Sequence, residues 1–222
     1  MKNLVAFAFF TLIASVALGQ HHTPDCKCPV NQYAGTSPAA IFHLANGRSI
    51  ALCGSEVTDI IKGKTLYSEF VLSVCGSNKL IKFWGATDIC NIRTLKDTLF
   101  VETLVNLPVG KAMSYRETIW TTERIYFIKG KLKRDSAVNF AIPKYNPSQI
   151  SAVLNLYNKT KDQNSVKTGE LIDKLFISTI SGSRQARTLL INFHKKFTLL
   201  DGYVAEQYDD VIRMLNLWDK KS

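Results

Sequence analysis

Two histidines and two cysteines, His21, His22, Cys26 and Cys28, stand close together near the start of the chain. If processing removes the residues up to Gly19, a free amine lies two positions before His22. A free amine, two amides and an imidazole in that spacing can bind Cu(II) or Ni(II) in a square plane. We therefore regard the four residues as a candidate metal site. The simpler alternative is that the histidines lie on an extended arm and the cysteines are structural. No other cofactor is expected.

A second group able to bind a ligand is the run of cations Lys129, Lys131, Lys133 and Arg134. On a β-strand, a spacing of two places the lysines on one face, where their ammonium groups can follow a line of anionic groups. Lysines on an edge strand also discourage pairing with other chains, and this simpler interpretation is favoured. The net charge of +10 suits anionic partners such as glycans, lipid headgroups or nucleic acid without naming one.

Motifs of the common catalytic classes are missing from the sequence: it has no Gly-x-Ser-x-Gly, no His-Glu-x-x-His, no phosphate-binding glycine loop and no double pair of cysteines. Glu117 and Glu123 share a strand parity but would lie about 20 Å apart on an extended strand, too far for paired carboxylate chemistry. His43 lies in an alternating strand, and His194 late in a predicted helix, where it complements the helix dipole. The sequence therefore leans away from an enzyme and names no catalytic residue.

The first nineteen residues have the layout of a secretory signal peptide. Lys2 precedes an apolar run, 4–18, and Gly19 ends it with a small residue. The run is short for a membrane span and polar residues follow directly, so we expect cleavage near Gly19 and no stable membrane insertion. The prediction is an exported protein, either periplasmic or secreted.

Export permits disulfides, and the chain has five cysteines: Cys26, Cys28, Cys53, Cys75 and Cys90. Cys26 and Cys28 are too close in sequence to bond comfortably to each other, so one or both are expected to pair with the three later cysteines. The odd number leaves at least one thiol, and the connectivity stays open.

The domain organisation follows from hydrophobic spacing. After an extended arm at 20–38, short alternating segments predict an antiparallel β region over 39–145. Asn46-Gly47 predicts a two-residue hairpin turn, which would place four residues on the core face: Phe42, Leu44, Ala51 and Cys53. The further strands are expected at 66–74, 79–84, 88–93, 98–105, 115–121, 124–131 and 137–142.

The spacing of apolar residues changes to about 3.6 in the region 146–222, which predicts four amphipathic helices. Their expected N-terminal caps are Asn146, Thr168, Ser183 and Asp201. Because no flexible linker separates the two regions, we expect the helices to pack on the sheet. The predicted fold is α+β: an antiparallel sheet, as a sandwich or half-barrel, followed by a C-terminal four-helix region.

The leading interpretation is an exported, non-enzymatic binding or structural protein whose partner is an unknown macromolecule or an anionic envelope component. One alternative is a hydrolase that acts on envelope or extracellular polymers, and a lesser one is a metal-handling protein that uses the N-terminal arm. A deep cleft with convergent polar groups between sheet and helices would favour the hydrolase. A flat basic or aromatic surface would favour binding.

Overall fold

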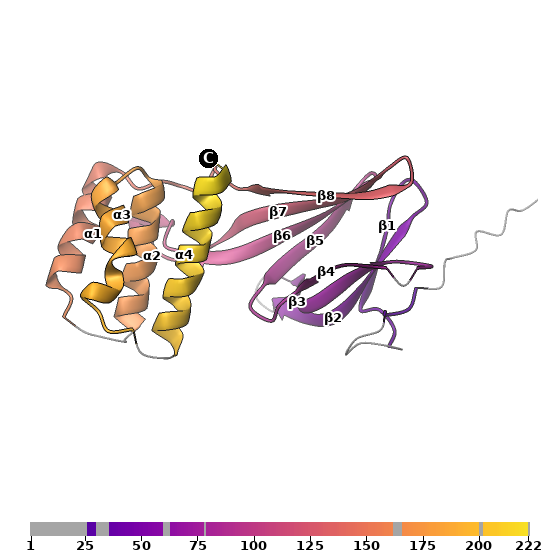
Figure 1. The fold of residues 1–222 in the computed structure, drawn as a ribbon, viewed down its shortest axis with the longest axis horizontal. Helices are drawn as coiled ribbons and strands as arrows, with labels where there is room; N and C mark the ends of the chain where they lie inside the picture. Colours follow the sequence, from indigo (N-terminus) through magenta and orange to yellow (C-terminus); the bar gives the residue numbers. More distant parts are fainter. Residues whose placement is uncertain are drawn as a thin grey trace, which may run out of the picture.

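The computed structural model describes residues 26–29, 36–59, 63–77, 79–161, 166–199 and 202–221. Within them, an antiparallel sheet precedes a group of helices, which confirms the predicted α+β fold (Figure 1). The strands are β1 (Ala40–His43), β2 (Ser49–Asp59), β3 (Lys64–Val74), β4 (Leu80–Trp84), β5 (Ile89–Leu95), β6 (Thr98–Leu107), β7 (Arg116–Ile128) and β8 (Lys131–Val138). The helices are α1 (Pro147–Lys159), α2 (Val166–Ile180), α3 (Arg184–Ile191) and α4 (Tyr203–Lys221), with short 3-10 turns η1 (Lys111–Met113) and η2 (Phe193–Lys195). The predicted signal peptide lies outside the described residues.

The first hairpin differs from its prediction by one residue. The backbone N–H of Leu44 donates to the carbonyl of Arg48 at 2.8 Å, so the loop has three residues and Gly47 takes a positive φ of 78°. A one-residue slip moves every side chain of a strand to the other face. Leu44 remains on the core side, but Ala51 and Cys53 lie on the opposite face, so that part of the prediction is wrong.

The C-terminal strands also differ from the prediction. β7 runs unbroken across the point where the sequence suggests a gap between two strands, and β8 begins six residues earlier than predicted. Between them, Lys129 and Gly130 have φ values of 47° and 77°, the positive values of a tight two-residue turn. The strand predicted at 137–142 is therefore wrong beyond Val138, because the chain leaves the sheet there.

Two branches of one sheet enclose the first hydrophobic core. The strand order is β1-β2-β3-β5-β6-β7-β8, and β4 also pairs with β3. Tyr67 of β3 pairs with Cys90 of β5, while the later residues of β3 pair with β4, so the sheet divides at β3 and curves strongly (Figure 1). The enclosed residues are Leu44, Ile50, Leu52, Tyr67, Phe70, Leu72, Ile81, Trp84, Cys90, Ile92, Leu99, Val101 and Ile125.

A bulge in β3 makes this curvature possible. The pairing of β2 with β3 passes from Gly54 opposite Phe70 to the next residue opposite Ser68, so Glu69 is the extra residue and has a φ of 47°. Phe70 then stacks on Trp84 at 4.8 Å between ring centroids. A Cβ on Gly54 would lie 2.4 Å from the Cβ of Phe70, so only glycine fits opposite Phe70.

The second core forms where the helices meet the far ends of β6, β7 and β8. α2 is central, with α1, α3 and α4 packed around it, and its apolar residues are almost all buried. Trp120 of β7 joins sheet to helices, since its ring lies edge-on to Phe176 of α2 at 5.7 Å and stacks on Trp218 of α4 at 6.0 Å. The expectation that the helices pack on the sheet is met by this shared core.

The helix caps were partly predictable. Asn146 caps α1 in a capping box with Gln149, and the Ser183 side chain accepts from the backbone N–H of Ala186 at the start of α3, as predicted. The prediction for Thr168 is wrong, because it is a fully buried residue inside α2. The fourth predicted cap, Asp201, lies outside the described residues.

A buried carboxylate also joins sheet and helices. Asp173 of α2 is 2 % exposed and accepts hydrogen bonds from the Tyr115 hydroxyl at 2.8 Å and from the Gln207 side chain at 2.5 Å. Burial disfavours the charged form and raises the pKa of Asp173 to about 6, although both hydrogen bonds oppose the rise. The folded state therefore binds the Asp173 proton more tightly than the unfolded state does. The stability that this proton contributes is fully present below about pH 4 and is lost as the pH rises through 6.

Replacing Asp173 with asparagine should stabilise the protein at pH 7.5 by about 2–3 kcal/mol and leave its stability at pH 4 nearly unchanged. Urea unfolding of both proteins at the two pH values measures this difference. An Asp173→Asn protein that is no more stable than the wild type at pH 7.5 would contradict the assignment.

Gly54→Ala should destabilise the fold by about 3 kcal/mol, because the added methyl group overpacks against Phe70. Gly85→Ala is the matched control, since the nearest atom to its new Cβ is 3.9 Å away, and it should change the free energy of unfolding by about 0.5 kcal/mol or less. Thermal unfolding of the two variants compares them directly; equal losses would argue against the steric explanation.

Candidate functional site: a basic groove beside the disulfide-bonded arm

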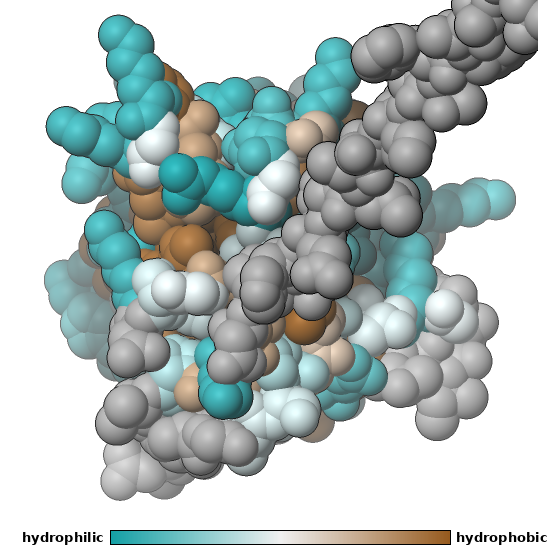
Figure 2. All heavy atoms as spheres, turned by 90° about the vertical axis from the view of Figure 1, so that its right-hand side faces the viewer, coloured by the Kyte–Doolittle hydropathy of each residue, from teal (hydrophilic) through white to brown (hydrophobic). Residues whose placement is uncertain are grey.

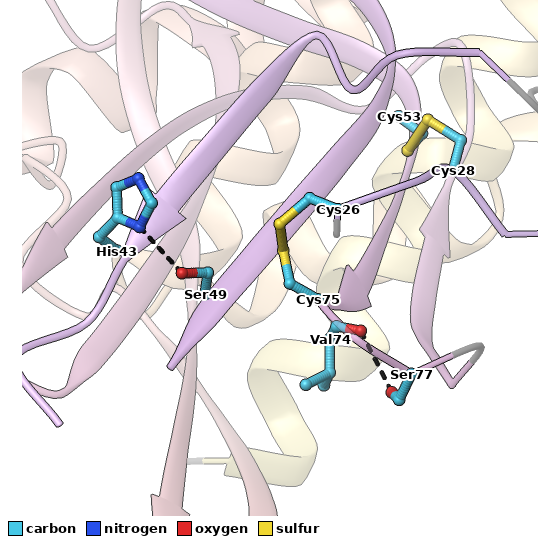
Figure 3. The surroundings of a disulfide bond; sticks show 8 residues. All are labelled: Cys26, Cys28, His43, Ser49, Cys53, Val74, Cys75 and Ser77. Carbon is cyan, nitrogen blue, oxygen red and sulfur yellow. Dashed lines mark hydrogen bonds between the residues drawn. A yellow bond between two sulfur atoms is a disulfide. The ribbon is translucent and has the colours of Figure 1, made fainter. Parts of the chain in front are cut away.

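Two disulfides attach the N-terminal arm to the sheet (Figure 3). Cys26 bonds to Cys75 at the end of β3, and Cys28 bonds to Cys53 of β2. Cys28 and Cys53 form a small buried cluster with Val71 on the outer face of the sheet, which explains why the reversed face of β2 is still buried. The arm therefore covers part of the sheet surface that the curved core does not use.

The candidate metal residues divide between described and undescribed parts of the chain. Cys26 and Cys28 are each half of a disulfide, and a disulfide sulfur does not supply the thiolate that binds metals. His21 and His22 lie outside the described residues. No cluster of three or more histidine, cysteine or acidic residues is placed to hold a metal in the part that is described.

Cys90 is the cysteine that keeps its thiol. Its side chain is 0 % exposed in the first core, and burial raises its pKa to about 12. Such a thiol is almost entirely protonated at neutral pH and is inert toward disulfides and alkylating reagents. Cys90 therefore has a packing role.

The two disulfides should open in a fixed order when the native protein is treated with dithiothreitol. Cys26–Cys75 is half-buried, while Cys28 and Cys53 are 6 % and 1 % exposed, so the first bond is the accessible one. Alkylation followed by peptide mass analysis should label Cys26 and Cys75 first and Cys90 only after denaturation. Earlier labelling of Cys28 and Cys53 would contradict this order.

The predicted cationic row is divided by the turn between β7 and β8. Lys131 and Lys133 lie on β8, which ends the strand order and is an edge strand, whereas Lys129 lies in the turn. Arg134 lies on the other face, where its Nε donates to Glu123 at 2.7 Å and its Nη1 donates to the carbonyl of Ile81 at 2.6 Å. The patch therefore retains its lysines and loses Arg134, which connects β8 to β4.

The lysines of β8 line a groove of about 630 Å³ between this strand and the turn that joins β3 to β4. Its cations are Arg48, Lys79, Lys131 and Lys133, and none of the described residues that line it is acidic. No ion pair joins any of these four side chains to a carboxylate in the described part of the chain. Within the described residues, the groove therefore concentrates positive charge that no carboxylate compensates.

An apolar floor lies beneath these cations. It consists of Val74, Phe127 and Leu132, and the guanidinium of Arg48 lies over the Phe127 ring at 4.5 Å. Figure 2 looks onto this end of the sheet and shows hydrophilic side chains around an apolar recess. Cys75 also lines the groove, so the Cys26–Cys75 disulfide fixes one wall.

Arg48 and Lys79 were not identified from the sequence. Each is the first cation after a turn, Arg48 after Asn46-Gly47 and Lys79 after Cys75-Gly76-Ser77. Nothing in the local pattern shows that these two turns lie beside the β7–β8 turn, because the curvature of the whole sheet brings them together. His43, which the sequence left without a chemical role, lies across from Ser49 and bonds to its hydroxyl at 2.8 Å (Figure 3).

The glutamates considered for paired chemistry lie on opposite faces of the sheet. Trp120 is an extra residue in β7, because the pairing with β6 passes from Thr121 to Ile119 and so reverses the parity between them. Glu123 faces inward and pairs with Lys82 at 2.8 Å, while Glu117 lines a separate pocket of about 440 Å³ on the outer face. The two carboxylates therefore do not share a site.

A buried acid, Glu102, also lines that outer pocket. Glu102 is 6 % exposed and accepts from Asn91 Nδ2 and Arg93 Nε, both at 2.8 Å. One guanidinium and one amide thus occupy both carboxylate oxygens, which makes Glu102 a structural anion that joins β6 to β5.

Comparison with known proteins identifies no relative. No protein-family model matches the chain, and no curated protein or solved structure is significantly similar to it. Of the helices described, none combines the length and the apolar character needed to cross a membrane.

Proposed function

We propose that the protein is an exported, non-enzymatic binding protein that holds an anionic partner in the basic groove. The observation that carries the proposal is the convergence of four cations from three separate hairpins: Arg48, Lys79, Lys131 and Lys133. Their mutual repulsion is relieved when an anion enters between them, so the groove favours occupation by negative charge.

The covalent attachment of the arm supports the export part of the proposal. Structural disulfides form and persist mainly in oxidising compartments, and one of the two, Cys26–Cys75, borders the groove. Together with the signal-like segment at 1–19, they favour a protein that works in the periplasm or outside the cell. A groove held by a disulfide is rigid, which lowers the entropic cost of binding.

Neutralising the groove should weaken binding to immobilised dextran sulfate, polyphosphate and polyglutamate by at least tenfold at low salt. The variant carries four substitutions: Arg48→Gln, Lys79→Gln, Lys131→Gln and Lys133→Gln. Raising the salt concentration should reduce the wild-type affinity steeply, because the groove is open to solvent and screening acts on it. Surface plasmon resonance at 50 and 300 mM NaCl measures both effects.

The matched control removes the same charge from exposed lysines outside the groove: Lys111→Gln, Lys144→Gln, Lys195→Gln and Lys220→Gln. It should keep most of the wild-type affinity. Equal losses in the two quadruple variants would mean that net charge alone attracts these polymers, and the groove would then have no part in function.

A further inference from the structure

Among the described strands, β8 pairs only with β7, and its other edge forms one side of the groove. Gly130, Lys131, Leu132 and Lys133 are consecutive lining residues, as expected where a groove runs along a strand edge. In a tight two-residue turn, the residue after the turn directs its N–H back to the preceding strand. The backbone N–H and C=O groups of Lys131 and Lys133 therefore point toward β7. Leu132 and Arg134 therefore direct their backbone groups away from β7.

Farther along β8, two contacts to other elements follow the groove. The Nζ of Lys221 donates to the carbonyl of Ser136 at 3.2 Å, which confirms that this carbonyl points outward. The side chain of Arg134 extends across to the carbonyl of Ile81 in β4. The lining of the groove ends at Lys133, before these two contacts, and Leu132 is the lining residue whose backbone groups point away from β7.

Side chains on β8 alternate in character as well as direction. Leu132 packs against the first core beside Phe127, whereas Lys131 and Lys133 lie on the outer face. A strand added to this edge would place every second side chain beside the apolar floor and the others beside the lysines. Apolar residues alternating with acidic residues satisfy both sets of neighbours.

We infer that the partner held in the groove is an extended acidic polypeptide segment that adds to the edge of β8 as a further strand. This inference rests on the proposed function and specifies the chemistry of its ligand. Backbone hydrogen bonds to Leu132 contribute affinity, and the four cations make the groove specific for an acidic sequence.

The same lysines disfavour the addition of most other strands to this edge. A neutral or basic strand would have to approach uncompensated ammonium groups, which is the usual way in which proteins protect an edge. An acidic strand instead compensates them. Lys131 and Lys133 therefore disfavour most strands but favour acidic ones. The two interpretations given to these lysines from the sequence, edge protection and binding of an anionic partner, are thus compatible.

The lining favours a peptide over a nucleic acid or a glycan. Single-stranded nucleic acids and sugars are commonly bound by exposed aromatic faces. Phe127 is the aromatic residue among the described lining residues, and the guanidinium of Arg48 covers its ring. The groove offers instead an apolar floor, a strand edge and positive charge.

The test uses the disulfide-intact protein and three fluorescein-labelled peptides of eight residues in which glutamate alternates with valine. One peptide is unmodified, one is N-methylated at the valines and one at the glutamates. Backbone N–H groups of alternate residues point to opposite sides of a strand, so only one methylated peptide loses its hydrogen bonds to β8. We expect that peptide to bind at least tenfold more weakly by fluorescence anisotropy and the other to bind like the parent.

Protein variants complete the test. The double variant Lys131→Gln with Lys133→Gln should bind the unmodified peptide more weakly than the wild type does. The control, Lys195→Gln with Lys220→Gln, should bind it as the wild type does. Equal binding of both methylated peptides and the parent, or binding of dextran sulfate without binding of the parent, would overturn strand addition and leave the anionic groove in place. Binding of neither the peptides nor dextran sulfate would overturn the proposed function as well.

Discussion

The paired strands β6 and β7 belong to two hydrophobic cores at once, and the arrangement of the molecule depends on this. At one end, Leu99 and Ile125 lie in the core enclosed by the curved sheet. At the other, Leu107 and Trp120 lie in the core built around α2. Two strands that enter both cores leave little freedom for the halves to move independently, because bending between them would disturb hydrogen bonds along the pair. Sheet and helices therefore form one continuous body (Figure 1).

Closure of the curved sheet depends on charge as well as apolar packing. Glu123 is buried on the inner face and accepts from Lys82 of β4 and Arg134 of β8. These two strands are at separate ends of the branched sheet, so one carboxylate holds them near each other. A buried acid with two cationic partners is tolerated because both of its oxygens are satisfied. The basic groove is lined by the residues of β8 that directly precede Arg134.

The order of the elements could be predicted from the sequence because it depends on local spacing. The change from alternation to a helical period is visible near Asn146, and the caps at Asn146 and Ser183 follow from side-chain chemistry. Single extra residues such as Glu69 and Trp120 could not be predicted in this way, since each is stabilised by partners on other strands. Each shifts the parity of its strand, and for this reason the shared parity expected of Glu117 and Glu123 is wrong.

The candidate site shows the same division between local and global information. Lys131 and Lys133 could be found because their spacing is regular along one strand. Arg48 and Lys79 could not, because they reach the groove only through curvature that arises over the whole sheet. Arg134 has the same charge and is adjacent in sequence, yet it faces the carboxylate of Glu123. Charge type was thus readable from the sequence, while the direction of each side chain was not.

The disulfide-bonded arm also determines how the protein responds to mechanical tension. A pull on the chain before Cys26 passes through its sulfur to Cys75, and so into the end of β3. The second bond transfers load from Cys28 to Cys53, and β1 lies within the 25-residue separation that this bond spans. Because covalent links bypass β1, tension does not peel this short edge strand away. Force enters the sheet instead at Cys53 of β2 and at Cys75, and because Cys75 lines the groove, a pull on the arm would act beside the residues that hold a partner.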